Sequence, residues 1–198
     1  MAEVGHVDPL RASLRGAVAG DAVAMRRLID GVAPSVYRVA RTILGPGGDV
    51  EDATQESLLA LVGALGAYRG DCSVLHYACR IAVWTAVRAR RRAARRAEKL
   101  AATLPTDRAW IPETVEPGSS ALAARRRELL RGLLDELPDV QAQTLALRVV
   151  LGCSMIEVAE ATGAPVNTVR SRLRLAKEAL RKRIENDPLL AEMLEVAG

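Results

Sequence analysis

The spacing of apolar residues along the chain predicts helices throughout. Leu, Val, Ile and Ala recur every three or four positions, as on one face of a helix, and no long run alternates apolar and polar residues as a strand does. Proline and glycine interrupt the pattern at 45–48 and within 98–120. The sequence therefore predicts an all-α protein of two small helical domains joined by a flexible Pro-rich linker, with a helix-turn-helix in the C-terminal domain.

The expected domain boundaries follow from these breaks. Residues 1–20 have only a weak pattern and are expected to form an N-terminal tail, either a frayed end or a short helix, and residues 186–198 a C-terminal tail. The first helical domain is expected over 21–97 and the second over 121–185, with 98–120 as the linker.

Four helices are expected in the first domain, over about residues 21–29, 34–44, 49–65 and 73–97. Asp21, Asp49 and Ser73 are the expected N-caps, because their side chains can accept hydrogen bonds from free amides of the first turn. Pro34 is expected to open the second helix, where its missing N–H is not needed. On the third helix, Asp49, Asp52, Gln55 and Glu56 share a polar side, whereas the apolar residues are Leu58, Leu59, Leu61, Val62 and Leu65.

The most informative local pattern lies within 153–184. Ser154 followed by Glu157 forms a capping-box pattern, in which each residue satisfies a free amide of the other. Gly163 is suited to end the first helix with a positive φ, and Pro165 to start the next one. Two helices joined by a tight glycine turn predict a helix-turn-helix.

The second helix of this pair separates an apolar face from a basic one. The apolar positions are Val166, Val169, Leu173, Ala176, Leu180 and Ile184, and the basic stripe holds Arg170, Arg174, Lys177 and Arg181. A basic face alone is commonly just a solvated surface. Beside the capping box and the glycine turn, however, it favours DNA binding in the major groove. The expected contacts are Asn167, Thr168, Arg170, Ser171, Arg174 and Lys177.

The fourth expected helix ends in a run of arginines at positions 88, 90, 91, 92, 95 and 96, with no acidic residue between them. Tyr77, Ile81 and Trp84 precede this run at helical spacing. Aromatic rings beside arginines suit single-stranded nucleic acid, because bases stack on rings while arginines follow the backbone. The rings can equally belong to the core, since they share a face with Ile81, and both interpretations stay open.

Composition and the remaining chemistry exclude several classes. Cys72, His76 and Cys79 would lie within two helical turns, but three ligands without a fourth make a poor zinc site, so packed reduced thiols and no metal are expected, and Cys153 is assigned to the core. The chain has two histidines and no acid–base or nucleophile cluster, so neither an enzyme nor a cofactor is expected. Lacking a signal-peptide pattern and a membrane-length apolar run, it is expected to be cytoplasmic without membrane insertion.

Three stretches in order resemble a known family. They are residues 49–56, residues 68–73 with 80–82, and Leu137-Pro138 with 165–173. Together they resemble a group 4, or extracytoplasmic-function (ECF), sigma factor of the sigma-70 family, the promoter-recognition subunit of bacterial RNA polymerase. The likeness spans residues 21–97 and 121–185.

The resemblance implies a partner for each stretch. Docking on core RNA polymerase, through its β′ clamp and β flap, would use Asp49, Asp52, Gln55 and Glu56 for the clamp. Opening of the minus-10 promoter element would use Tyr68, Arg69, Asp71, Ser73, Trp84, Arg88 and Arg91. The six contacts expected on the second helix of the helix-turn-helix would read the minus-35 element of promoter DNA, and an anti-sigma factor would regulate the chain. Two positions depart from the family pattern, with Trp84 where many members carry Asn and Leu175 where an Arg is common.

Two other functions fit parts of the sequence. A helix-turn-helix repressor or activator with a dimerising or sensing front domain would explain 154–184, but not the acidic stretch 49–56 or the arginine run. A polymerase-binding adaptor would explain the acidic stretch, and it predicts that Arg170 and Arg174 are dispensable.

Overall fold

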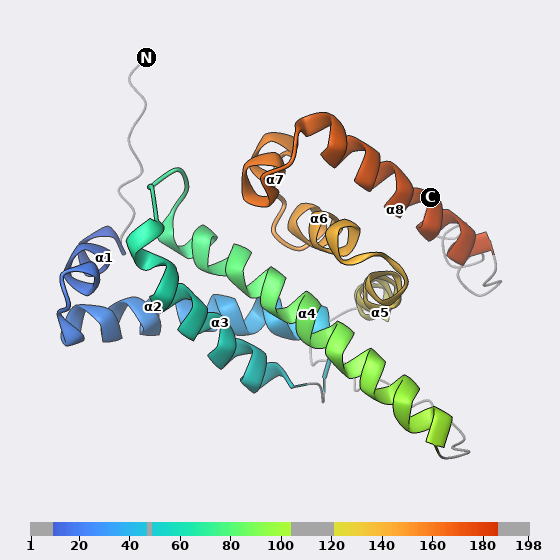
Figure 1. Cartoon of the computed structure of the whole chain (residues 1–198), viewed down its shortest axis with the longest axis horizontal. Coiled ribbons are helices and arrows are strands. Elements are labelled where there is room, and N and C mark those ends of the chain that lie inside the picture. Colours follow the sequence, from blue (N-terminus) through green and yellow to red (C-terminus); the bar gives the residue numbers. More distant parts are fainter. Residues whose placement is uncertain (1–9, 47–48, 104–120, 186–198) are drawn as a thin grey trace. The chain divides into compact units, whose positions relative to one another are not determined.

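The computed structural model describes residues 10–46, 49–103 and 121–185, and within them every regular element is a helix (Figure 1). The all-α prediction is confirmed. The chain forms two compact units, residues 1–89 and 90–198, and the boundary falls inside one long helix, α4. Within the described ranges, none of the helices combines the length and hydropathy of a membrane-crossing segment.

The first unit is built on α2 and its neighbours. Its elements are α1 (Arg11–Val18), α2 (Ala22–Leu44), α3 (Val50–Ala64), the 3-10 turn η1 (Leu65–Ala67) and the first part of α4 (Val74–Thr103). Small aliphatic residues from three helices meet in a shared core, with Ala40 from α2, Val50 and Ala53 from α3, and Ala89 from α4. Such short side chains let the helix backbones approach closely.

One continuous helix, α2, replaces the two helices expected here. The sequence predicts a break before Pro34, whereas Pro34 lies inside α2 and is exposed. The buried positions continue through it at helical spacing, with Leu28 and Val32 before the proline and Val36 after it, each at most 1% exposed. We attribute the difference to this burial, which outweighs the one backbone hydrogen bond that a proline removes.

The expected caps are correct in two cases of three. Asp21 accepts a hydrogen bond from the Val23 amide at 2.8 Å, and Ser73 accepts one from the His76 amide at 3.1 Å. Asp49 occupies the N-cap position of α3, but its side chain makes no capping hydrogen bond. Its carboxylate is therefore left exposed at the start of α3.

A packed helix, α1, occupies part of the expected N-terminal tail. Leu14 and Ala17 of α1 are buried, and α1 contacts α2 within the first unit. Gly16 lets α1 approach α2, because a Cβ there would lie 2.5 Å from the Cβ of Ala24. Residues 1–9 of the expected tail lie outside the described residues.

The last helix of the front half is longer than expected. The sequence places its end near Ala97, whereas α4 continues to Thr103. The added residues include Glu98, Lys99 and Leu100, all good helix formers, and the first proline comes only at position 105. The rest of the expected linker, 104–120, and the expected C-terminal tail, 186–198, lie outside the described residues.

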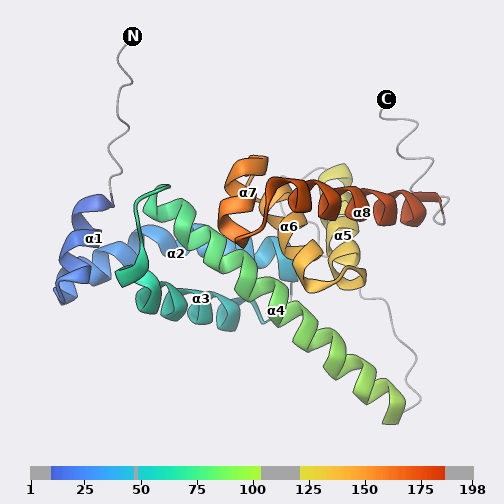
Figure 2. The same cartoon turned by 45° about the horizontal axis from the view of Figure 1, so that its top comes forward.

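The second unit contains the predicted helix-turn-helix. Its helices after α4 are α5 (Ala121–Glu136), α6 (Asp139–Val149), α7 (Met155–Thr162) and α8 (Val166–Glu185). In both views α6, α7 and α8 lie side by side, and all three contact one another (Figure 2). Leu147, Val158 and Val169, one from each helix, have no exposed surface. The α7–turn–α8 segment is thus held on α6 by an aliphatic core.

We expect Gly16→Ala to lower the melting temperature of the full chain. An added Cβ would overlap Ala24, and overpacking costs about 1–3 kcal/mol, more than the roughly 0.5–1 kcal/mol that alanine gains over glycine in a helix. Gly63→Ala is the matched control, because a Cβ at that position of α3 meets no atom within 4 Å. The control should melt at or above the parent temperature. If Gly16→Ala melted no lower than the parent, the close contact of α1 with α2 would be wrong.

Candidate functional site

Local hydrogen bonds fix the turn that presents α8. Ser154 Oγ accepts from the Glu157 amide at 3.2 Å, and the Ser154 amide donates to Glu157 Oε2 at 2.7 Å. This is the predicted capping box. Gly163 ends α7 with a φ of 62°, in the left-handed region that glycine adopts at low cost. Before α7, Arg148 Nη1 donates to the carbonyl oxygen of the buried Cys153 at 2.6 Å.

The expected DNA contacts share the outer side of α8. Val169, Leu173 and Ala176 are buried on the inner side. The exposed residues are Asn167, Arg170, Ser171, Arg174 and Lys177, and Thr168 is half-buried. The structure therefore brings the polar candidates together on the exposed side of one helix.

Two arginines of this face have weak partners on α8 itself. Arg170 Nη1 donates to Asn167 Oδ1 at 2.9 Å, and Arg174 Nη1 lies 2.5 Å from Glu178 Oε1. Both partners of the second contact are more than half exposed. Exposed pairs of this kind contribute at most about 1 kcal/mol, so either guanidinium can exchange its partner for a stronger acceptor.

The acidic side of α3 is exposed along its whole length. Asp49, Asp52, Gln55 and Glu56 face solvent, while Ala53, Ser57 and Leu61 on the other side are buried. Two apolar residues extend the exposed side, with Leu59 73% and Val62 38% exposed. Leu59 lies three residues after Glu56 and four after Gln55, and this helical spacing is the signal in the sequence that places it on the polar side.

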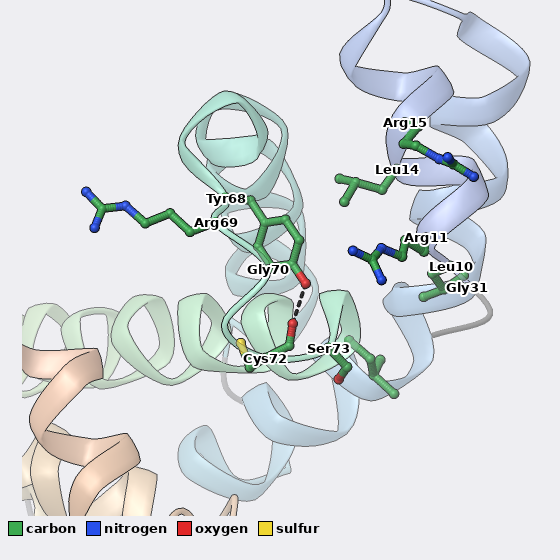
Figure 3. Close-up of a pocket in the computed structure, with 11 residues that line it drawn as sticks. Leu10, Arg11, Leu14, Arg15, Gly31, Tyr68, Arg69, Gly70, Cys72 and Ser73 are labelled. Carbon is green, nitrogen blue, oxygen red and sulfur yellow. Dashed lines mark hydrogen bonds between the residues drawn. The ribbon is translucent and has the colours of Figure 1, made fainter. Parts of the chain in front are cut away.

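The loop between η1 and α4 is closed by its own tyrosine. Tyr68 Oη donates a hydrogen bond to the Cys72 carbonyl oxygen (Figure 3). The Tyr68 ring also packs on that of Tyr77, with centroids 5.1 Å apart. Gly70 has a φ of 84°, which allows the chain to reverse inside this closed turn. Arg69 points away from Tyr68, into solvent (Figure 3).

The other residues expected at the minus-10 element differ in exposure. Asp71, Ser73 and Arg88 are exposed, and Trp84 is half-buried on α4. Arg91 belongs to the second unit, where it is half-buried and its Nε lies 2.9 Å from Asp139 Oδ1. The structure thus groups the loop residues and leaves Arg91 in a separate ion pair.

The cysteines are free thiols. Burial raises the pKa of the Cys79 thiol, and the nearby Arg38 opposes this only in part. Cys79 is therefore a neutral, unreactive thiol at physiological pH. Cys72 is half-buried in the loop, with its Sγ 3.9 Å from Arg80 Nη1. Across the part of the chain that the structure describes, no three His, Cys, Asp or Glu side chains are grouped to hold a metal ion.

Comparison with known proteins gives consistent matches in both halves. The family model "Sigma-70 region 2" matches residues 28–96, and "Sigma-70, region 4" matches residues 127–180. The ECF RNA polymerase sigma factor SigD of Mycobacterium bovis is 33% identical over 180 residues, covering 88% of this chain and 84% of the relative. The ECF RNA polymerase sigma-E factor of Escherichia coli K12 is 30% identical over 145 residues, covering 71% and 76% respectively.

Two solved structures have a similar fold. One is CnrH in complex with the cytosolic domain of CnrY, with a TM-score of 0.56 and 22% identity over 89% of this chain and 97% of that chain. The other is the sigma factor RpoE in complex with the anti-sigma factor NepR from Bartonella quintana, with a TM-score of 0.53 and 18% identity over 82% and 97%.

We expect Tyr68→Phe to loosen the loop without unfolding the chain. The ring contact with Tyr77 is kept, while the hydrogen bond to Cys72 is removed, which costs about 1 kcal/mol. Amide hydrogen exchange of residues 69–72 should therefore accelerate severalfold. Tyr77→Phe is the control, because its hydroxyl reaches the Ala64 carbonyl only at 3.5 Å, the limit of a hydrogen bond. Equal exchange in both variants would contradict a loop closed by Tyr68.

Proposed function

This chain belongs to the sigma-70 family of RNA polymerase sigma factors, in its ECF branch, and we propose how its surfaces divide the work of initiation. It is a promoter-recognising subunit whose partners are core RNA polymerase and promoter DNA. The observation that carries this conclusion is the presence of regions 2 and 4, in order, with the helix-turn-helix inside the second. A repressor with a sensing front domain would not account for region 2.

We propose that each domain recognises one part of the promoter. Residues 21–97 act as region 2, which docks on the polymerase and opens the minus-10 element. Residues 121–185 act as region 4, which reads the minus-35 element. Residues 104–120 connect α4 to α5 in the sequence. Sigma factors are DNA-recognition subunits and not enzymes, so no residue has a catalytic role.

The exposed side of α8 reads the minus-35 element. An α-helix fits the major groove of B-DNA, where a guanidinium can bind both acceptors of a guanine. Arg170 and Arg174 lie one turn apart on the outer side and hold only weak partners. Asn167, Thr168 and Ser171 supply shorter polar groups beside them, and Lys177 meets the phosphate backbone.

The exposed side of α3 docks on the β′ clamp. Its acids, Asp49, Asp52 and Glu56, together with Gln55, suit a basic partner and steer association. Leu59 supplies an apolar anchor at the same surface, since 73% of it is exposed in the free chain. Covering such a side chain contributes about 1.5–3 kcal/mol, which makes it a candidate hot spot.

The loop 68–73 and α4 capture the melted minus-10 element. A base that leaves the duplex must be held by stacking and by hydrogen bonds to its edge. Tyr68 and Trp84 offer rings, and Arg69, Asp71 and Ser73 offer polar groups. Arg88 and Arg91 follow the backbone of the displaced strand, and Arg91 must leave Asp139 to do so.

Regulation and location follow from the same function. The relative RpoE is solved with an anti-sigma factor. We propose that an anti-sigma protein likewise holds this chain inactive until a signal releases it. The chain works in the cytoplasm, where core polymerase and the promoters are.

Docking can be tested by charge reversal. Asp52→Lys with Glu56→Lys should abolish co-purification with core polymerase, because two attractive charges become repulsive. Leu59→Ala should weaken it about tenfold or more through reduced apolar burial. Asp30→Lys is the control, since Asp30 is an acid of α2 outside this surface. Undiminished co-purification of the double variant would remove the docking role of α3.

The proposed reading of the promoter predicts that substitutions in α8 and in α4 weaken DNA binding in two different ways. Arg170→Ala should cost about 1–3 kcal/mol of binding and relax specificity at one minus-35 position. Arg95→Ala, in the arginine run of α4, should weaken all promoters alike and lower the salt slope by about one unit. Binding of holoenzyme to promoter variants at several salt concentrations separates the two. If both variants gave the same uniform loss, α8 would not read bases and the adaptor function would be favoured.

A further inference from the structure

A cavity of about 810 Å³ lies between α1 and the loop 68–73, within the first unit (Figure 3). Arg11, Leu14 and Arg15 line it from α1, and Tyr68, Arg69 and Ser73 from the loop. Its volume falls in the range of about 300–1,000 Å³ that is typical of ligand pockets. The family model begins only at residue 28, so it gives α1 no role.

Packing holds α1 as a fixed wall of this cavity. Gly16 permits the close approach to Ala24, and Gly31 of α2 leaves space for Leu10, whose Cδ2 would lie 2.6 Å from a Cβ at that position. Leu14 is buried beneath the helix. The arginines of α1 are therefore carried by a helix that is anchored to the domain core.

The lining combines positive charge with apolar surface. Three of the described residues that line the cavity are arginines and none of those residues is acidic, although the side chain of Arg69 extends away from α1 (Figure 3). Arg11 and Arg15 are exposed and one helical turn apart. Figure 3 shows Arg11 and Leu14 extending from α1 toward the loop. A guanidinium pairs well with phosphate, while the half-buried Tyr68 ring can contact a sugar or base.

We propose that α1 is part of the promoter-opening surface, and that Arg11 and Arg15 bind phosphates of the non-template strand beside the base held by the loop. This inference rests on the proposed capture of the minus-10 element by residues 68–73. It extends the DNA-binding surface of the first unit to a helix that precedes the region 2 match. A free nucleotide shares the same phosphate chemistry and is the competing occupant.

The test uses holoenzyme assembled from the full chain and core polymerase. The probe is a fluorescent single-stranded oligonucleotide with the non-template minus-10 sequence, taken from mapped transcript starts. Arg11→Gln and Arg15→Gln should each weaken binding about two- to fivefold. The double variant should lower the log–log salt slope by about 1.4, or roughly 0.7 for each phosphate that is no longer neutralised. Discrimination against a substituted minus-10 base should stay unchanged, because phosphates carry no sequence information.

Two controls separate the outcomes. Arg26→Gln removes an equal charge from an exposed site on α2 and should leave the slope unchanged. Tyr68→Ala reports on the loop itself. If Tyr68→Ala weakens binding while the Arg11 and Arg15 variants behave like Arg26→Gln, the role of α1 is wrong and loop capture stands.

Two further results would also overturn the inference. Binding that is insensitive to Tyr68→Ala would reject loop capture, and the role of α1 with it. Free deoxythymidine monophosphate that binds as tightly as the oligonucleotide, and loses this binding in Arg11→Gln, would make the cavity a nucleotide site instead. Unchanged melting of the Arg11 and Arg15 variants, expected because both side chains are exposed, shows that the weaker binding does not come from unfolding.

Discussion

Burial of one aliphatic face per helix is the constraint on which this structure depends. The chain has no Phe and few aromatic residues, so its cores are assembled from Ala, Val, Leu and Ile. Small side chains bury little area each, and they stabilise the fold only where backbones come close. Gly16 against Ala24 is one such approach, and Ala40 with Ala53 another. Because each helix buries one face in this way, the proposed functional residues lie on the opposite faces and in the loop 68–73.

The sequence was sufficient to predict those features that neighbouring residues determine. The capping box of Ser154 and the left-handed Gly163 are set by neighbouring residues, so the helix-turn-helix and the outer face of α8 could be predicted. The prediction of a break at Pro34 was wrong, because it considered the one missing hydrogen bond but not the buried stripe that continues across the proline. The prediction that the Asp49 side chain caps α3 was also wrong, since an aspartate at the N-cap position can accept this hydrogen bond but does not have to.

Features that depend on tertiary contacts could not be predicted. The pattern of α1 is too short to identify a packed helix, and it becomes one through the close approach that Gly16 and Gly31 allow. Leu59 carries an apolar side chain among other apolar residues of α3, so residue type alone did not reveal that it faces solvent, although its spacing from Gln55 and Glu56 indicates the polar side. The closure of the loop by Tyr68 joins a hydroxyl to a carbonyl oxygen, and every residue has such a carbonyl. Residue type alone therefore identified the candidate surfaces but not their limits.

The two proposed DNA surfaces solve different physical problems. A duplex presents its major groove without distortion, so the arginines of α8 can rest on weak partners such as Glu178 and exchange them on contact. A captured base must first leave its stack, which costs a few kcal/mol. A site that also had to order itself would add to this cost, whereas a preformed site does not. The hydrogen bond of Tyr68, its packing on Tyr77 and the anchored helix α1 give the first unit such a preformed surface. The surface of the first unit, where the DNA has to open, is therefore rigid, whereas α8, which reads an undistorted duplex, carries adaptable side chains.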